Sequence, residues 1–114
     1  KLLELFADII KTNIRKSDIP IRYGGEEFLI LIRDLDRKTA RSVAERIRRQ
    51  LEKECKYLVN SSDLDCTVTV SCGVSQYPTD SDNIREAIEF ADMALYVAKR
   101  SGKNTVVCYE EIKQ

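Results

Sequence analysis

Two consecutive glycines, Gly24 and Gly25, stand between two short apolar segments, and this arrangement constrains the fold more than any other feature of the sequence. Before the glycines, residues 19–23 alternate between apolar and other side chains, and after them residues 28–32 are continuously apolar. Both glycines can adopt positive φ, which tight turns between two strands require. The sequence therefore predicts a β-hairpin. Its second strand is apolar on both faces, so we expect it to be central and covered.

Three segments repeat apolar residues at steps of three and four, which is the period of an amphipathic helix. They extend from Leu2 to Ile14, from Ala40 to Leu51 and from Ile84 to Ala98, the last with Asn83 and Glu86 as a candidate capping box. Residues 53–65 resemble a loop, with the polar residues Asn60 to Asp63 as its expected tip. Residues 67–75 alternate as a strand does, and Val106 begins a last strand.

The predicted order is helix, strand, strand, helix, strand, helix, strand, which indicates an α+β fold. With one further strand in front, this order becomes a split βαβ (ferredoxin-like) arrangement, an antiparallel sheet flanked by helices. The first helical pattern starts at Lys1 without an N-cap or a preceding strand. We therefore expect the chain to begin inside a domain whose leading strand is absent.

Composition excludes some functions. The 114 residues include 19 basic and 19 acidic side chains, and a nucleic-acid-binding protein usually has a basic excess. Histidine is absent, so proton chemistry or metal binding must rest on carboxylates, lysines or thiols. The four cysteines (Cys55, Cys66, Cys72 and Cys108) lack C-x-x-C spacing, which argues against zinc or disulfides. We expect Cys72 and Cys108 to be plain buried thiols in a reducing cytoplasm.

Two acids, Glu26 and Glu27, follow the glycines at the expected hairpin tip. One interpretation is a solvated tip whose charges discourage association of strand edges. The other is that Glu26 binds a hard divalent cation, because carboxylate oxygens suit Mg²⁺ and Mg²⁺ suits triphosphates. The glycines would then let a ligand approach the backbone closely. These residues by themselves leave both interpretations open.

Three separated motifs resemble the GGDEF family of diguanylate cyclases, in its common GGEEF form. They are Arg22-Tyr23-Gly24-Gly25-Glu26-Glu27-Phe28, then Val70-Ser71-Cys72-Gly73-Val74, then Ala91 to Lys99 followed by Ser101-Gly102-Lys103-Asn104. Members of this family condense two GTP into cyclic di-GMP and release two pyrophosphates. The resemblance implies the family's nucleotidyl-cyclase-like fold. It also implies that residues 1–114 are a partial GGDEF domain lacking its N-terminal strand and first helix.

The resemblance also implies roles for residues around the hairpin. Glu26 matches the acid that binds the catalytic metal, Mg²⁺ or Mn²⁺, and helps to activate the 3′-hydroxyl nucleophile. Glu27 is the neighbouring acid of the catalytic motif. Gly24 and Gly25 match the turn over which the nucleotide lies, and Lys99 matches a phosphate-binding lysine.

Lys103 stands where the family usually has arginine, so it keeps the positive charge but loses the bidentate fork of a guanidinium. Without the family motifs, Lys99 and Lys103 would be interpreted as cations that complement the negative end of a helix.

The R-x-x-D sequence of Arg15 and Asp18 resembles the family's inhibitory site, where arginine and aspartate bind the product cyclic di-GMP. An arginine can bind phosphate or a guanine edge, and an aspartate can accept from guanine N–H groups. By itself the pattern is usually an exposed ion pair. Arg46 matches a further arginine that reaches this ligand from another subunit. Its neighbours Arg48 and Arg49 alternate with acids, which predicts a solvated helix face.

For the parent protein, the resemblance implies an active, product-inhibited cyclase. It implies a homodimer, because each domain presents one GTP, and an upstream sensory domain. We expect the 114-residue chain by itself not to turn over GTP, because a single carboxylate holds Mg²⁺ poorly. Two alternatives stay open, a non-catalytic cyclic di-GMP receptor and a GTP-binding regulatory or dimerisation module.

Overall fold

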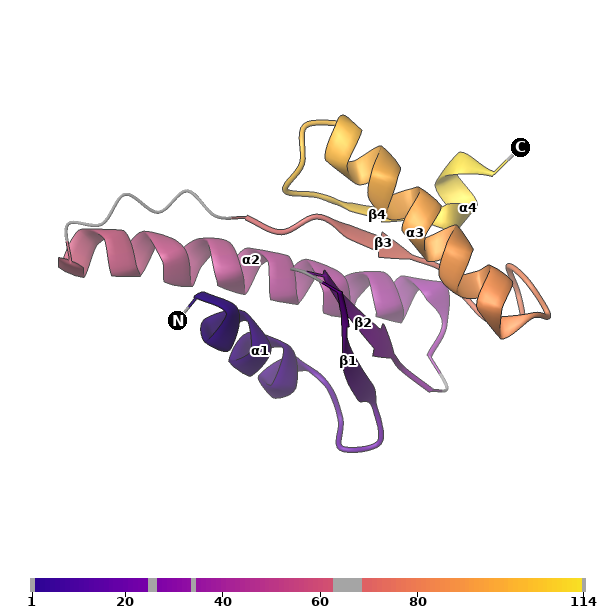
Figure 1. Ribbon diagram of the computed structural model, residues 1–114, viewed down its shortest axis with the longest axis horizontal. Helices are drawn as coiled ribbons and strands as arrows, with labels where there is room; N and C mark the ends of the chain where they lie inside the picture. The colour runs from indigo at the N-terminus through magenta and orange to yellow at the C-terminus, as the bar shows by residue number, and fades with distance from the viewer. Residues whose placement is uncertain (1, 25–26, 34, 63–68, 114) are drawn as a thin grey trace.

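A computed structural model of the chain describes residues 2–24, 27–33, 35–62 and 69–113 (Figure 1). In chain order its elements are α1 (Leu2–Asn13), β1 (Ile19–Gly24), β2 (Glu27–Leu31), α2 (Arg37–Ser62), β3 (Cys72–Val74), α3 (Ile84–Arg100), β4 (Val106–Cys108) and α4 (Tyr109–Ile112). Helices and strands thus mix along the chain, and the predicted α+β class is confirmed.

The long helix α2 divides the molecule into two parts (Figure 1). On one side, α1 and the β1–β2 hairpin pack against it. On the other side lie β3, α3, β4 and α4. Among the helices in the described part of the chain, none is both long and apolar enough to cross a membrane.

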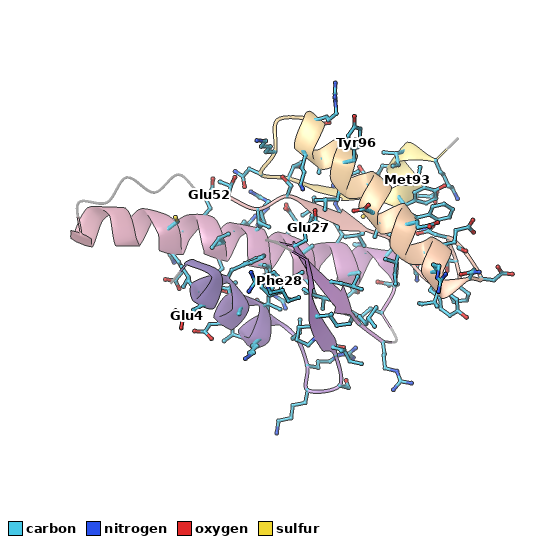
Figure 2. The ribbon with its side chains drawn as sticks, in the orientation of Figure 1. Glu4, Glu27, Phe28, Glu52, Met93 and Tyr96 are labelled. Carbon is cyan, nitrogen blue, oxygen red and sulfur yellow. The ribbon has the colours of Figure 1, made fainter. Side chains whose placement is uncertain are left out.

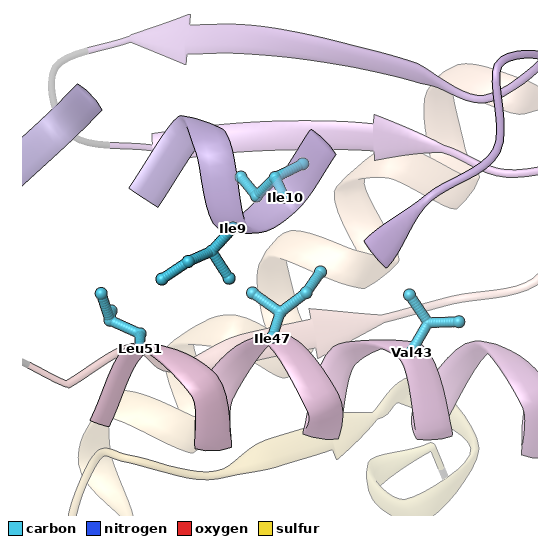
Figure 3. Packing of buried hydrophobic residues seen from close by; sticks show 5 residues of the cluster. All are labelled: Ile9, Ile10, Val43, Ile47 and Leu51. Carbon is cyan, nitrogen blue, oxygen red and sulfur yellow. The ribbon is translucent and has the colours of Figure 1, made fainter. Parts of the chain in front are cut away.

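The main hydrophobic core lies between α1 and α2. Ile9 and Ile10 of α1 face Val43, Ile47 and Leu51 of α2, and each of the five is at most 7% exposed (Figure 3). The α2 residues are spaced at four, so they form one stripe on a single helix face. Burial of apolar surface contributes a free energy of roughly 25 cal/mol per Å². Burial of this stripe therefore holds α1 against α2.

The hairpin is antiparallel, with Ile21 opposite Leu29. One face packs on the core, where the Phe28 ring meets the edge of Phe6 with ring centroids 5.1 Å apart. On β1, Ile19 is 51% exposed. The prediction that the second strand is central and covered is wrong for the described strands, because β2 pairs with β1 in a two-stranded sheet and each of its residues is half-buried.

The second part is a βαβ unit, with β3 paired parallel to β4 and α3 connecting them. The single antiparallel sheet of the prediction is therefore wrong for the described strands, which form an antiparallel pair, β1–β2, and a separate parallel pair, β3–β4. Small residues let α3 lie against the strands, and Ala87, Ala94 and Ala98 are at most 4% exposed. The approach is closest at Gly73, where an added Cβ would lie 2.1 Å from the Ala91 carbonyl oxygen. This site explains why a strand as short as β3 contains a glycine.

Two predicted element boundaries need correction, and one helix was not predicted. The loop predicted over residues 53–65 is helical as far as Ser62, because Lys53 and its glutamate neighbours form helices well and Cys55 continues the buried stripe. The strand predicted over residues 67–75 contains only Cys72–Val74 among the described residues. The last helix, α4, was not predicted, because four residues are too few to show a helical period.

The cysteines divide into two kinds. Cys72 and Cys108 are free thiols, as expected, and burial raises the pKa of the Cys72 thiol to about 12. Cys55, however, is disulfide-bonded, which contradicts the expectation from cysteine spacing. Spacing along the chain cannot reveal such a bond, because it depends on which side chains the fold brings together.

The predicted start of α3 is confirmed in part. The Asn83 side chain accepts from the backbone N–H groups of Arg85 and Glu86, as an N-cap does. Glu86 accepts from the Ser81 hydroxyl at 2.7 Å, so its carboxylate is bound two residues upstream of the N-cap.

Candidate functional site

The tip of the hairpin and the end of α3 meet in space. Lys99 Nζ, in the last turn of α3, lies 3.4 Å from Glu27 Oε2 at the start of β2. Figure 2 shows Glu27 at the end of the hairpin that points toward the α3 part of the molecule. Residues 72 positions apart in sequence therefore form an ion pair, and both side chains are close to half-exposed. This is the position that the sequence predicts for a nucleotide site.

Positive charge collects at this end of α3. Lys99 and Arg100 occupy its last turn, and Lys103 follows in an exposed turn. The negative end of the helix dipole accounts for some of this charge. Of these three cations, Lys99 is the one whose side chain contacts the described part of the hairpin, through Glu27.

The other predicted tip residues are only partly described. Gly24 ends β1 opposite Glu27, with an irregular register between Arg22 and Gly24. Gly25 and Glu26 lie outside the described residues, so their predicted roles stay predictions. Within the described part of the chain, no group of three side chains could hold a metal ion.

Arg15 and Asp18 form a closed pair at the opposite end of β1. Arg15 Nη2 lies 3.1 Å from Asp18 Oδ1, and Arg15 Nε donates to Oδ2 at 3.3 Å. Arg15 Nη2 also donates to the Arg33 carbonyl oxygen. The Asp18 side chain is only 2% exposed, whereas that of Arg15 is 51% exposed. An incoming ligand would thus meet the guanidinium, and Asp18 acts by orienting it.

The pKa of Asp18 is consistent with this geometry. Burial by itself raises it, but the hydrogen bonds and charge of Arg15 outweigh burial, so the net pKa lies below the usual 3.8. The carboxylate is therefore charged near neutral pH and holds the arginine in place.

Arg46 lies beside this pair through the end of α1. Its Nε donates to Asn13 Oδ1 at 3.1 Å and its Nη2 to the Asn13 carbonyl oxygen at 3.0 Å. Asn13 is two residues before Arg15. Arg46 is therefore connected to the Arg15–Asp18 pair through the end of α1, by its two bonds to Asn13. The Arg15–Asp18 pair is separated from the Glu27–Lys99 pair by the length of β1, about 17 Å at 3.3 Å per residue.

One group of polar residues was missed by the sequence analysis. Arg48, expected on a solvated face, has a side chain only 14% exposed and donates to Glu45 Oε1 at 2.6 Å. Its Nη1 donates to Asn104 Oδ1 at 2.9 Å, and Asn104 Nδ2 donates to Glu52 Oε2 at 2.9 Å. The C-terminal position of Asn104 in a family motif was a signal for this contact, but its partners were not recognisable from charge patterning.

Tyr96 lies on the exposed face of α3, with its hydroxyl outside the core. Tyr96 is 61% exposed, and Arg100 donates to its hydroxyl at 3.2 Å while its guanidinium carbon lies 5.6 Å from the ring centroid. The outer face of α3 thus combines an aromatic ring with a cation (Figure 2).

The comparisons with known proteins identify the family of the chain. The family model described as "Diguanylate cyclase, GGDEF domain" matches residues 1–105. Diguanylate cyclase A from Treponema denticola is 39% identical over 105 residues, which are 92% of this chain and 28% of that protein. The response regulator PleD from Caulobacter vibrioides is 36% identical over 107 residues, which are 94% of this chain and 23% of that protein.

Solved structures show the same fold. The active GGEEF domain of a diguanylate cyclase from Vibrio cholerae superposes with a TM-score of 0.83 at 27% identity, covering 99% of this chain and 67% of that one. The chain spans less than a third of the length of the curated relatives named above. Motifs, fold and family model agree over nearly all of the sequence, and the chain belongs to the GGDEF diguanylate cyclase family.

Proposed function

We propose that this chain is the cyclase module of a protein that condenses two GTP into cyclic di-GMP. In each of two transfers, the 3′-hydroxyl oxygen of one nucleotide bonds to the α-phosphorus of the other. The bond from that phosphorus to the β-phosphate oxygen breaks, the hydroxyl loses its proton, and pyrophosphate leaves. Two transfers close the ring and release two pyrophosphates, so the atoms balance.

The observation that carries this proposal is the 3.4 Å contact between Lys99 and Glu27. This contact brings the GGEEF hairpin next to the cationic end of α3. A triphosphate substrate requires cations close to the residues that bind it. Without ligand, Glu27 neutralises the lysine. When GTP binds, a phosphate would take over Lys99, since an exposed ion pair of this kind is worth only about 0–1 kcal/mol and is easily exchanged.

The other site residues have the roles that the family resemblance implies. Lys99 and Lys103 bind phosphate oxygens, and Gly24 and Gly25 allow the nucleotide to approach the backbone. Glu26 is the residue we expect to bind Mg²⁺ or Mn²⁺, which would lower the pKa of the attacking hydroxyl and neutralise phosphate charge.

We propose that the isolated 114-residue chain is inactive. Glu26 is the one carboxylate expected to hold the metal, and Mg²⁺ bound by one carboxylate and phosphates is held poorly. Each domain presents one GTP, so the active form is proposed to be a homodimer, with its assembly controlled by a sensory domain in the parent protein.

The proposed product inhibition uses Arg15, Asp18 and Arg46. The exposed face of the Arg15 guanidinium and the exposed Arg46 side chain can bind the phosphates of cyclic di-GMP. Asp18, buried under Arg15, holds the guanidinium in its binding orientation. A site at this end of β1 leaves the hairpin tip free for substrate.

The test is incubation of the full-length protein with GTP and Mg²⁺, with cyclic di-GMP measured by mass spectrometry. Glu26→Ala should abolish product, and Lys99→Ala should reduce it at subsaturating GTP. Lys113→Ala is the matched control, because Lys113 forms a similarly exposed ion pair, 3.0 Å from Glu110 of α4. Equal effects of the two lysine substitutions would contradict the assignment of Lys99.

Arg15→Ala tests the inhibitory site. We expect the enzyme to lose inhibition by added cyclic di-GMP while its initial rate changes little. The matched control is Arg49→Ala, because Arg49 is also an exposed arginine in an ion pair, 3.6 Å from Glu45. Binding of cyclic di-GMP without any turnover by the full-length protein would favour the receptor alternative instead.

A further inference from the structure

We propose that Asn104 is a positioning residue that fixes the turn carrying Lys103 by bonding its side chain to Arg48 and Glu52 of α2. This inference rests on the proposed function, in which Lys103 binds a phosphate of GTP. It adds a contact between α2 and the substrate site that acts without touching substrate.

The turn after α3 has an unusual backbone. Gly102, Lys103 and Asn104 all have positive φ, at 102°, 61° and 47°. Only glycine adopts this region without cost, and asparagine tolerates it better than most residues. Lysine does not favour it. Something outside the local sequence must therefore stabilise Lys103 in this conformation.

The turn is tied down on both sides. Before it, the Lys103 backbone N–H donates to the Ala98 carbonyl oxygen at 3.1 Å, which ends the helix. After it, the Thr105 carbonyl oxygen accepts from the Cys72 N–H at 2.9 Å, which begins the approach to β4. Between these points, the Asn104 side chain is the connection to α2 that the structure shows.

That side chain uses both ends of its carboxamide. The oxygen accepts from Arg48 Nη1 at 2.9 Å, and the nitrogen donates to Glu52 Oε2 at 2.9 Å. A carboxamide is the group that can do both, because its acceptor oxygen and its donor nitrogen are bonded to the same carbon. Aspartate at this position would place a second carboxylate against Glu52.

The partners on α2 are themselves fixed. Arg48 is only 14% exposed and also donates to Glu45 Oε1 at 2.6 Å, and this hydrogen bond is the largest cause of its raised pKa. Glu52 lies one helical turn from Arg48, with 3.9 Å between their charged atoms. Asn104 thus binds two side chains, Arg48 and Glu52, that are already held in place on α2. Because these side chains are already ordered, they lose little conformational entropy when the turn docks.

The Asn104 contacts therefore fix the backbone position from which the Lys103 side chain extends. A lysine has a compact charge on a flexible stem, so its contribution to phosphate binding depends on where its backbone is held. Release of the turn would spread Lys103 over many positions. GTP affinity would fall while the chemistry at the hairpin would be little changed.

The test is a double-mutant cycle in the full-length protein, with KM for GTP and kcat measured by cyclic di-GMP formation. Asn104→Gly removes both side-chain bonds but keeps a residue that adopts positive φ, so the fold is preserved. We expect KM to rise about fivefold, the effect of losing roughly one net hydrogen bond, with kcat within about twofold. In a Lys103→Ala background, Asn104→Gly should change KM by less than about twofold, because the two residues act through one interaction.

Glu52 provides a rescue control. Glu52→Gln keeps an oxygen that accepts from Asn104, so KM should stay within about twofold of the parent. Glu52→Ala removes that acceptor and should raise KM as Asn104→Gly does. A circular dichroism melt of each variant separates loss of folding from loss of binding.

The outcomes distinguish this inference from the proposed function. If the unmodified protein neither binds nor converts GTP, the proposed function fails. If Lys103→Ala raises KM but Asn104→Gly does not, or if Asn104→Gly raises KM equally in both backgrounds, the positioning role is wrong. The same conclusion follows if Lys103→Ala leaves KM unchanged.

Discussion

Gly73→Ala is the substitution that the packing of α3 on β3 forbids most clearly. An added Cβ would lie 2.1 Å from the Ala91 carbonyl oxygen, 2.3 Å from the Leu95 nitrogen and 2.9 Å from the Leu95 Cα. All three are backbone atoms, which cannot turn away as a flexible side chain can. We therefore expect the variant to fold only if strand and helix move apart.

The size of that movement sets the cost. Ordinary contact with a Cβ begins near 3.4 Å, so β3 and α3 would have to separate by more than about 1 Å. The same helix buries Ala87, Ala94 and Ala98, which would lose contact together. Overpacking a closely fitted core costs about 1–3 kcal/mol, and here we expect about 3 kcal/mol because only backbone can yield. A domain of this size is stable by only about 5–15 kcal/mol.

The assay is urea denaturation of the GGDEF domain followed by circular dichroism. The matched control is Gly102→Ala, since an added Cβ there would meet no atom within 4 Å, although φ is +102°. The control should lose only about 1 kcal/mol, from backbone strain. If Gly73→Ala changes the free energy of unfolding by less than about 0.5 kcal/mol, or less than the control does, the close approach of β3 and α3 is wrong.

Three further predictions concern charge, thiol chemistry and stacking. Because Asp18 has a lowered pKa in the folded state, its contribution to stability is present above pH 3.8 and is lost as the pH falls through the lower folded value. Arg15→Ala removes the bonds that outweigh burial, so a carboxyl NMR titration should show the Asp18 pKa rising, and an unchanged titration would contradict the pairing. Cys72, with a pKa of about 12, should react with iodoacetamide at pH 8 about a thousandfold more slowly than an ordinary thiol, as mass spectrometry of the native protein can measure. Tyr109→Ala should lower the free energy of unfolding by about 2 kcal/mol, because it removes a ring stacked on Phe90 with centroids 4.0 Å apart, whereas a loss within measurement error would show that α4 is not held by this contact.

The hairpin and the three long helices follow from local sequence. Gly24 and Gly25 between apolar segments predict the turn, and apolar spacing of three and four predicts the helices, because both patterns reflect backbone geometry within a few residues. The end of α2 was misjudged, since the polar residues at 60–63 resemble a loop tip although the helix continues to Ser62. The α4 helix was missed because four residues are too few to show a helical period.

For the candidate site, the sequence determined which residue types are present and in what order. It placed acids on a hairpin and cations at a helix end, and the two motifs that contain Glu27 and Lys99 were recognisable from the sequence. Only the tertiary structure decided that these two side chains lie 3.4 Å apart, that Asp18 is buried beneath Arg15, and that Arg48 is not solvated. The physical reason is that local periodicity is fixed by neighbours along the chain, whereas contacts between α3, α2 and the hairpin arise from packing of distant faces, which no local pattern specifies.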